Sequence, residues 1–169
     1  MKPIAPFPHF ALVLSAAIGC GDDPPPPADV HGNYTLTVTN GPSTCPLPNW
    51  NQGAVTPNIP FTVTQNGSGV SADVGGLGAI FLNAYCGNAH LEGSVTGSDM
   101  DLSLAGTRGL TSGSCAFTID AHLVATLQND AISGSISYAP NTNSSADCAA
   151  VRTCAARMNF NGTRPPPGN

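Results

Sequence analysis

The chain has 169 residues with 19 glycines and 16 prolines, and only 9% of its residues are charged. Turn-forming residues are therefore plentiful and helix-forming residues scarce, which favours strands joined by tight turns. The formal net charge is −5, and the basic residues beyond Lys2 are Arg108, Arg152, Arg157 and Arg164. Nucleic acids and anionic membrane surfaces attract clustered basic groups, so we expect neither as a binding partner.

Residues 1–19 have the features of a secretory signal peptide. An apolar run from Phe10 to Gly19 ends in small residues directly before Cys20. The run is shorter than the ~20 residues of a membrane-spanning helix, and its length is within the ~7–15 apolar residues of a signal peptide. We therefore expect an exported chain from which residues 1–19 are removed.

Ala17-Ile18-Gly19-Cys20 resembles the lipobox of bacterial lipoproteins, with Ala17 where leucine is usual. The resemblance implies that the Cys20 sulfur carries a diacylglycerol and that its amine carries a further acyl chain such as palmitate. Two or more chains anchor a protein stably in a membrane. The implied location is the bacterial cell envelope, in the outer membrane or at the cell surface, because Gly21 rather than aspartate follows Cys20. Ordinary signal cleavage, with Cys20 left as a disulfide partner, is the alternative.

The rest of the chain divides into a spacer, one domain and a tail. Residues 20–31 are expected to be the lipid anchor and a proline-rich tether, because Pro24 to Pro27 favour an extended polyproline II spacer. Residues 32–163 suffice for one β-domain with one core. Residues 164–169 contain three consecutive prolines and are predicted to be a disordered tail.

Alternating apolar and polar residues predict half-buried strands along the domain. Tyr34, Leu36 and Val38, for example, alternate with threonines. The predicted strands cover residues 32–39, 59–65, 68–74, 78–86, 89–96, 99–106, 115–128, 131–138 and 155–161. Three connections are longer, at residues 40–58, 107–114 and 139–154, and the last contains a predicted helical turn between Ser145 and Thr153.

Four two-residue turns predict the register of neighbouring strands. Asn66-Gly67 is typical of a type I′ hairpin, and each turn brings apolar residues opposite one another. A shift by one residue would turn these side chains to the other face, so the turns together predict an antiparallel meander. The turns and predicted pairs are Asn66-Gly67 with Val63 and Val70, Gly87-Asn88 with Ala84 and Leu91, Gly97-Ser98 with Val95 and Met100, and Asn129-Asp130 with Leu127 and Ile132.

The predicted fold class is all-β, an antiparallel meander of eight to nine strands. Sequential hairpins favour an up-and-down barrel, and a two-sheet β-sandwich is the alternative. The strands from Phe61 to Phe160 number eight and would close with every pair antiparallel, whereas the strand around Tyr34 makes an odd ninth. The polar residues that alternate with the core predict a water-soluble domain, since a transmembrane barrel needs an apolar exterior.

The predicted strand connectivity of residues 32–161 resembles that of the small calycin barrels of the lipocalin and avidin group. Gly32-Asn33-Tyr34 stands where lipocalins begin with a glycine and a tryptophan. The resemblance implies a barrel that holds one small apolar ligand. Trp50, the only tryptophan, lies in the 40–58 connection and would contact such a ligand, cap the barrel mouth or pack against the core.

Six cysteines in an exported chain are expected to form disulfides rather than metal sites. A lipidated Cys20 leaves five, which gives two bridges and one free thiol, whereas an unmodified Cys20 allows three bridges. Strand parity and the long connections place the remaining cysteines at one end of the sheet, with their pairing open. These candidates are Cys45, Cys86, Cys115, Cys148 and Cys154.

The sequence predicts no metal site. His90 and Glu92 share an outer face with Asp120 and His122, residue types that bind zinc, but an intervening strand separates the two pairs by about 9–10 Å. The carboxylates of Asp99-Met100-Asp101 point outward beside a turn, where a calcium site would lack ligands.

No enzyme and no cofactor are predicted either, because Gly93-Ser94-Val95-Thr96-Gly97 carries valine where a hydrolase needs its nucleophile. The first functional hypothesis is a monomeric cell-envelope lipoprotein that displays a soluble, disulfide-bearing β-domain with a structural or binding role toward an envelope partner. Its contact with the membrane is through the lipid anchor. The alternative is a lipocalin-like carrier of a small apolar ligand, which a cavity of several hundred Å³ with a mouth near Trp50 would favour.

Overall fold

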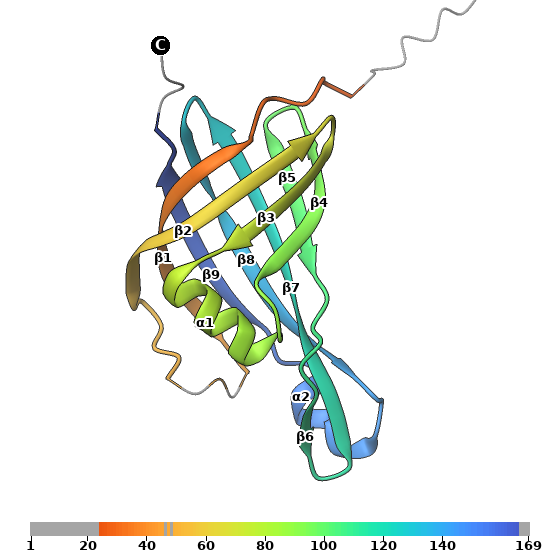
Figure 1. Cartoon of the computed structure of the whole chain (residues 1–169). Helices are drawn as coiled ribbons and strands as arrows, with labels where there is room; N and C mark the ends of the chain where they lie inside the picture. The colour runs from red at the N-terminus through yellow and green to blue at the C-terminus, as the bar shows by residue number, and fades with distance from the viewer. Residues whose placement is uncertain (1–23, 46, 48, 166–169) are drawn as a thin grey trace, which may run out of the picture.

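A computed structural model describes residues 24–45, 47 and 49–165, so the predicted signal peptide and the Cys20 lipidation site lie outside the described residues. Nine strands and two short α-helices are present in this part of the chain (Figure 1). In chain order the elements are β1 (Gly32–Ser43), β2 (Val55–Asn66), β3 (Gly69–Val74), α1 (Gly76–Tyr85), β4 (His90–Thr96), β5 (Asp99–Leu104), β6 (Leu110–Ser112), β7 (Cys115–Gln128), β8 (Ala131–Thr142), the 3-10 turn η1 (Ala146–Cys148), α2 (Ala149–Arg152) and β9 (Ala156–Thr163).

Eight of these strands close into an antiparallel up-and-down barrel. Strands β1 to β5 pair in sequence order, as do β7 to β9, and the ring closes through β5 with β7 and β9 with β1. The short β6 pairs with β7 outside the ring. The predicted all-β barrel is confirmed, and the sandwich alternative is wrong. The predicted helical turn is also present, as η1 and α2.

One predicted strand, at residues 78–86, is wrong. These residues belong largely to α1, so the predicted pair of Ala84 with Leu91 does not form and β3 pairs directly with β4. A short apolar run does not distinguish a strand from a helix by periodicity alone. Without this segment the strand around Tyr34 becomes the eighth in the ring, and an even number closes with every pair antiparallel.

The other three hairpins keep the predicted faces. Val95 pairs with Met100, and Leu127 with Ile132, as predicted. Between β2 and β3 the turn is Gly67-Ser68 instead of Asn66-Gly67, and Val63 pairs with Ala72 rather than with Val70. A type I′ turn at Asn66-Gly67 would need a positive φ at both residues, and of the two only Gly67 has one, at +61°. The register therefore moves by two residues, which preserves the alternation of faces.

The core fills the barrel with the inward side chains of the strands. Its largest fully buried members are Tyr34, Phe61, Leu91, Met100, Leu102 and Ile132. Most of the alternating polar side chains are exposed, as in β5, where Asp99, Asp101 and Ser103 face outward. Within the described residues, neither helix is long and apolar enough to cross a membrane.

The two ends of the barrel differ, as Figure 1 shows. The closed end carries the tight turns after β2, β4 and β7 together with the start of β1 and the end of β9. The open end carries α1, the β1–β2 connection, the β6–β7 hairpin and α2.

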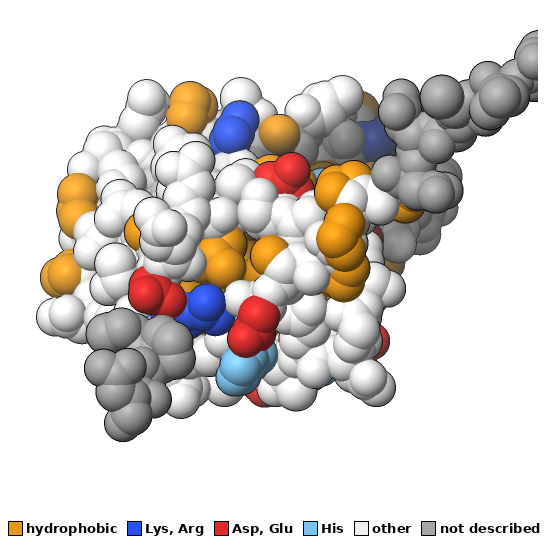
Figure 2. All heavy atoms as spheres, turned by 90° about the horizontal axis from the view of Figure 1, so that it is seen from above, with side chains coloured by type: hydrophobic (Ala, Val, Ile, Leu, Met, Phe, Trp, Pro, Cys, Tyr) orange, Lys and Arg blue, Asp and Glu red, His pale blue; other side chains and the backbone are white. Residues whose placement is uncertain are grey.

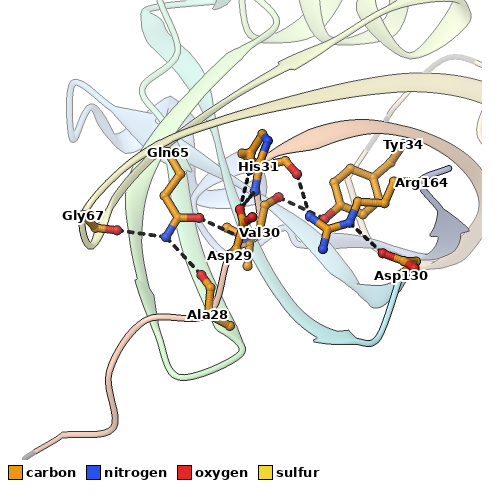
Figure 3. A network of polar contacts seen from close by, with 9 residues as sticks. All are labelled: Ala28, Asp29, Val30, His31, Tyr34, Gln65, Gly67, Asp130 and Arg164. Atoms are coloured by element: carbon orange, nitrogen blue, oxygen red, sulfur yellow. Dashed lines mark hydrogen bonds and ion pairs between the residues drawn. The ribbon is translucent and has the colours of Figure 1, made fainter. Parts of the chain in front are cut away.

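Part of the predicted tether lies across the closed end. Ala28 donates a backbone hydrogen bond to Gly97, and Val30 is fully buried. The Gln65 side chain accepts from Val30 N at 2.8 Å and donates to the Ala28 carbonyl at 3.0 Å (Figure 3). Tyr34 adds a hydrogen bond from its hydroxyl to the Val30 carbonyl. Residues 28–30 are thus held against the folded domain.

Arg164, predicted to begin a disordered tail, is instead held at the closed end. Its Nε donates to Asp130 Oδ1 at 3.0 Å, and a terminal nitrogen donates to the His31 carbonyl at 2.6 Å. The guanidinium also lies 5.7 Å from the ring centroid of Tyr34. The view of this end in Figure 2 shows a basic side chain between acidic ones, with a histidine beside them. These contacts join the N-terminal and C-terminal segments of the domain to each other at the closed end.

Candidate functional site

The open end is built around Trp50, which the β1–β2 connection holds in place. The indole Nε1 donates to the Gly41 carbonyl at 3.0 Å. The disulfide of Cys45 with Cys154 bonds the connection to the segment between α2 and β9. The backbone N–H groups of Gly53 and Thr44 donate to the carbonyls of Asn40 and Ala155. Trp50 is therefore fixed at the barrel mouth.

Helix α1 forms the second wall of the mouth. A Cβ on Gly78 would lie 2.7 Å from Val74 Cγ1 and 2.9 Å from Ile59 Cγ2, so glycine allows the helix to pack closely on the barrel. Phe81 and Tyr85 lie one helical turn apart and share a face. Both pack against the core, whereas Leu77 and Ile80 on the same helix are exposed.

Four aromatic rings from three segments meet at this end. The Phe81 ring lies 6.0 Å from Trp50, 4.6 Å from Tyr85 and 5.6 Å from Tyr138, measured between centroids. Trp50 and Tyr138 meet edge to face at 6.3 Å. Such spacings are those of favourable aromatic pairs, so the rings form one continuous wall.

A pocket of about 430 Å³ lies between this aromatic wall and the barrel core. Leu123, Ile136 and Phe160 extend its lining into the barrel, and Asn40, Asn49 and Thr56 supply polar groups from β1, β2 and their connection. Among the described residues that line it, none is a lysine, arginine, histidine, aspartate or glutamate. The volume is within the ~300–1,000 Å³ of small-molecule sites, which are mostly apolar with a few polar groups.

Tyr138 is the most buried polar side chain of the aromatic wall, at 3% exposure. Its hydroxyl donates to the thioether sulfur of Met158 at 3.6 Å. Burial raises the pKa of Tyr138 far above its ordinary value, so the hydroxyl remains protonated and able to donate. Tyr138 and Met158 both line the pocket.

The cysteines gather at the open end, as predicted. Disulfides join Cys45 to Cys154 and Cys115 to Cys148, and within the described part of the chain Cys86 is the free thiol. Cys86 is fully buried. Its burial, with a smaller contribution from the charge of Asp120, raises its pKa to about 12. The thiol is therefore protonated at neutral pH, whereas reactive cysteines have a lowered pKa.

The histidines and carboxylates considered as zinc ligands do not meet at one site. His90 contacts Asp73 at 2.7 Å and Glu92 at 3.4 Å, whereas His122 contacts Asp101 at 2.7 Å. Asp120 accepts from the backbone of Gly106, and Asp99 accepts from Thr126. Over residues 24–45, 47 and 49–165, no group of three or more histidine, cysteine, aspartate or glutamate side chains is arranged so that it could hold a metal ion.

A larger depression of about 520 Å³ lies over the outer faces of β4, β5, β7 and β8. Its lining includes the polar side chains of Asp99, Asp101, Thr126 and Ser133. The open-end pocket is the stronger candidate because its lining is continuous with the core.

Of the pocket residues, the sequence identified Trp50 as a candidate. It missed Phe81 and Tyr85, whose spacing of four residues was the available signal for a helical face. The predicted strands 131–138 and 155–161 contain Tyr138 and Met158, but no role in a site was predicted for either residue. The strand pattern does not reveal which inward side chains reach the barrel mouth. The chain matches no family model, no curated protein and no solved structure with which it was compared.

Proposed function

We propose that this chain is a lipid-anchored protein of the bacterial cell envelope whose barrel carries a small apolar ligand. The apolar, aromatic-walled pocket at the open end supports the carrier role. Protein interiors are packed with few voids larger than a water molecule, and an apolar cavity that water does not fill readily accepts an apolar molecule. An eight-stranded barrel is also wide enough for one small ligand.

The lipid anchor at Cys20 would orient the barrel. Gly97 donates a backbone hydrogen bond to Pro25, so the chain joins the closed end five residues after Cys20. Five residues span at most about 18 Å. The closed end would therefore lie near the membrane, and the pocket mouth would point away from it, where a ligand enters and leaves without crossing the lipid surface.

Ligand binding is tested with 1-N-phenylnaphthylamine, an uncharged aromatic probe whose fluorescence rises in apolar surroundings. We expect saturable binding with one probe per chain. Thr56→Trp should block binding, because Thr56 lines the pocket. Thr64→Trp is the matched control, since Thr64 is exposed on the same strand. Absence of saturable binding, or equal binding by both variants, would contradict the carrier role.

The anchor is tested by intact-mass analysis of protein isolated from bacterial membranes, with and without reduction. We expect the mass of a diacylglyceryl and an acyl group on a chain that begins at Cys20. Cys20→Ser should release the protein from the membrane fraction. An unlipidated wild-type chain would refute the anchor and leave the pocket assignment standing.

A further inference from the structure

From the pocket lining we infer that the ligand is an uncharged molecule with a flat apolar body and a hydrogen-bond acceptor that the Tyr138 hydroxyl binds. This inference rests on the proposed carrier function and specifies its ligand class. Three features of the pocket carry it: its uncharged lining, the weak acceptor now used by Tyr138 and the aromatic wall.

The lining selects against charged ligands. No basic or acidic side chain is present among its described residues. Transfer of a carboxylate or ammonium group into such surroundings without a partner is strongly unfavourable. A fatty acid could enter with its tail first only if its carboxylate stayed in water at the mouth.

Tyr138 supplies a donor inside the pocket. Its hydrogen bond ends on a thioether sulfur, which is a weak acceptor. Methionine side chains are flexible, so Met158 can move aside when a better acceptor arrives. A carbonyl oxygen of the ligand would then satisfy the buried hydroxyl with a stronger hydrogen bond.

The aromatic wall favours a flat ligand body. The indole N–H of Trp50 is already bonded to Gly41, so Trp50 offers the ligand its apolar ring. Phe81 and Tyr138 continue the ring surface, and stacked or edge-to-face contacts with planar groups are favourable there.

The test uses three probes of one shape, measured by competition with 1-N-phenylnaphthylamine. They are 2-acetylnaphthalene, which carries a ketone, 2-isopropenylnaphthalene, which replaces the oxygen by carbon, and 2-naphthoate, which replaces the methyl by a charged oxygen. We expect the ketone to bind about fivefold more tightly than the isopropenyl probe, the factor for a net hydrogen bond of about 1 kcal/mol. We expect 2-naphthoate to bind at least about tenfold more weakly than the ketone.

Tyr138→Phe should bind the ketone and the isopropenyl probe equally, because it removes the donor and keeps the ring. Tyr34→Phe is the matched control: its hydroxyl bonds to Val30 at the closed end, so the fivefold preference should persist. An equal affinity of wild type for both neutral probes, a preference that survives in Tyr138→Phe, or tight binding of 2-naphthoate would overturn the inference while leaving the carrier function intact. Failure of every probe to bind would overturn both.

Discussion

The two disulfides should differ in their effects on stability and on ligand binding. Cys45 and Cys154 are 109 residues apart in the chain, and Cys115 and Cys148 are 33 apart. A crosslink stabilises mainly by restricting the unfolded chain, and the loop-closure relation gives about 4.8 kcal/mol for the longer loop and about 3.8 kcal/mol for the shorter one. Alanine at both positions of a pair avoids placing a hydroxyl in a buried site.

Only the longer loop's bridge supports the pocket. Cys45 lies in the connection that carries Trp50. Cys45 and Trp50 are both half-buried, and both pack against the core. Cys115 and Cys148 belong to a separate apolar cluster with Val151, and neither lines the pocket. The affinity for 1-N-phenylnaphthylamine should therefore fall at least fivefold in Cys45→Ala/Cys154→Ala, and stay within about twofold in Cys115→Ala/Cys148→Ala.

Urea unfolding followed by far-ultraviolet circular dichroism measures both stabilities, and probe titration of the folded fraction measures the affinities. Each double variant is the control for the other, since both lose one bridge of the same barrel. A greater loss of stability in Cys115→Ala/Cys148→Ala would refute the loop-length reasoning. Equal probe affinity in the two variants would refute the claim that the bridge positions Trp50.

Three further changes test other parts of the fold. Arg164→Met should lower the free energy of unfolding by about 2 kcal/mol, because it leaves the Asp130 carboxylate and the His31 carbonyl without this donor; unchanged urea midpoints would contradict it. Gly134→Ala should lower the free energy of unfolding by about 1–3 kcal/mol in the same assay, since its Cβ would lie 2.1 Å from the Val124 carbonyl oxygen. An unchanged free energy of unfolding would show that the strands move apart freely. The hydrogen bond with Asp73 raises the pKa of His90 above 6.5. The contribution of this pair to folding stability is therefore fully present below pH 6.5 and is lost as the pH rises through the pKa of His90 in the folded protein. His90→Gln should therefore lower stability more at pH 6 than at pH 9, by under about 1 kcal/mol at this exposed pair, and an equal loss at both pH values would contradict the assignment.

The strands and their faces could be predicted because their signals are local. Turn residues and alternation determine which side chains share a face, and Val63 and Val70 are both buried although the turn between them lies one residue further on. The same parity placed Cys115 and Cys154 at one end, and the long connections placed Cys45 and Cys148 there. The pairing within that group could not be predicted, since it depends on how far each long connection folds back.

The closed end shows why composition alone misled at the domain boundaries. Prolines around residues 24–27 and 165–167 suggested an extended tether and tail. Gln65 and Tyr34, however, supply hydrogen-bond partners to the Ala28 and Val30 backbone, and Asp130 binds Arg164. These contacts join residues more than thirty positions apart, except for Tyr34 with Val30, and no local pattern predicts them.

Helix α1 connects barrel closure with the pocket. Had residues 78–86 formed a strand, the barrel ring would have had nine strands and could not have closed with antiparallel pairs throughout. As a helix, the segment lies outside the eight-stranded ring and connects β3 to β4, which pair directly. Its Phe81 and Tyr85 line the pocket at the open end instead of extending the sheet. The barrel interior then ends in side chains of a helix and a connection rather than in the tight turns that cover the other end. The departure from the predicted strand pattern is thus the same feature that gives the barrel a pocket at its mouth.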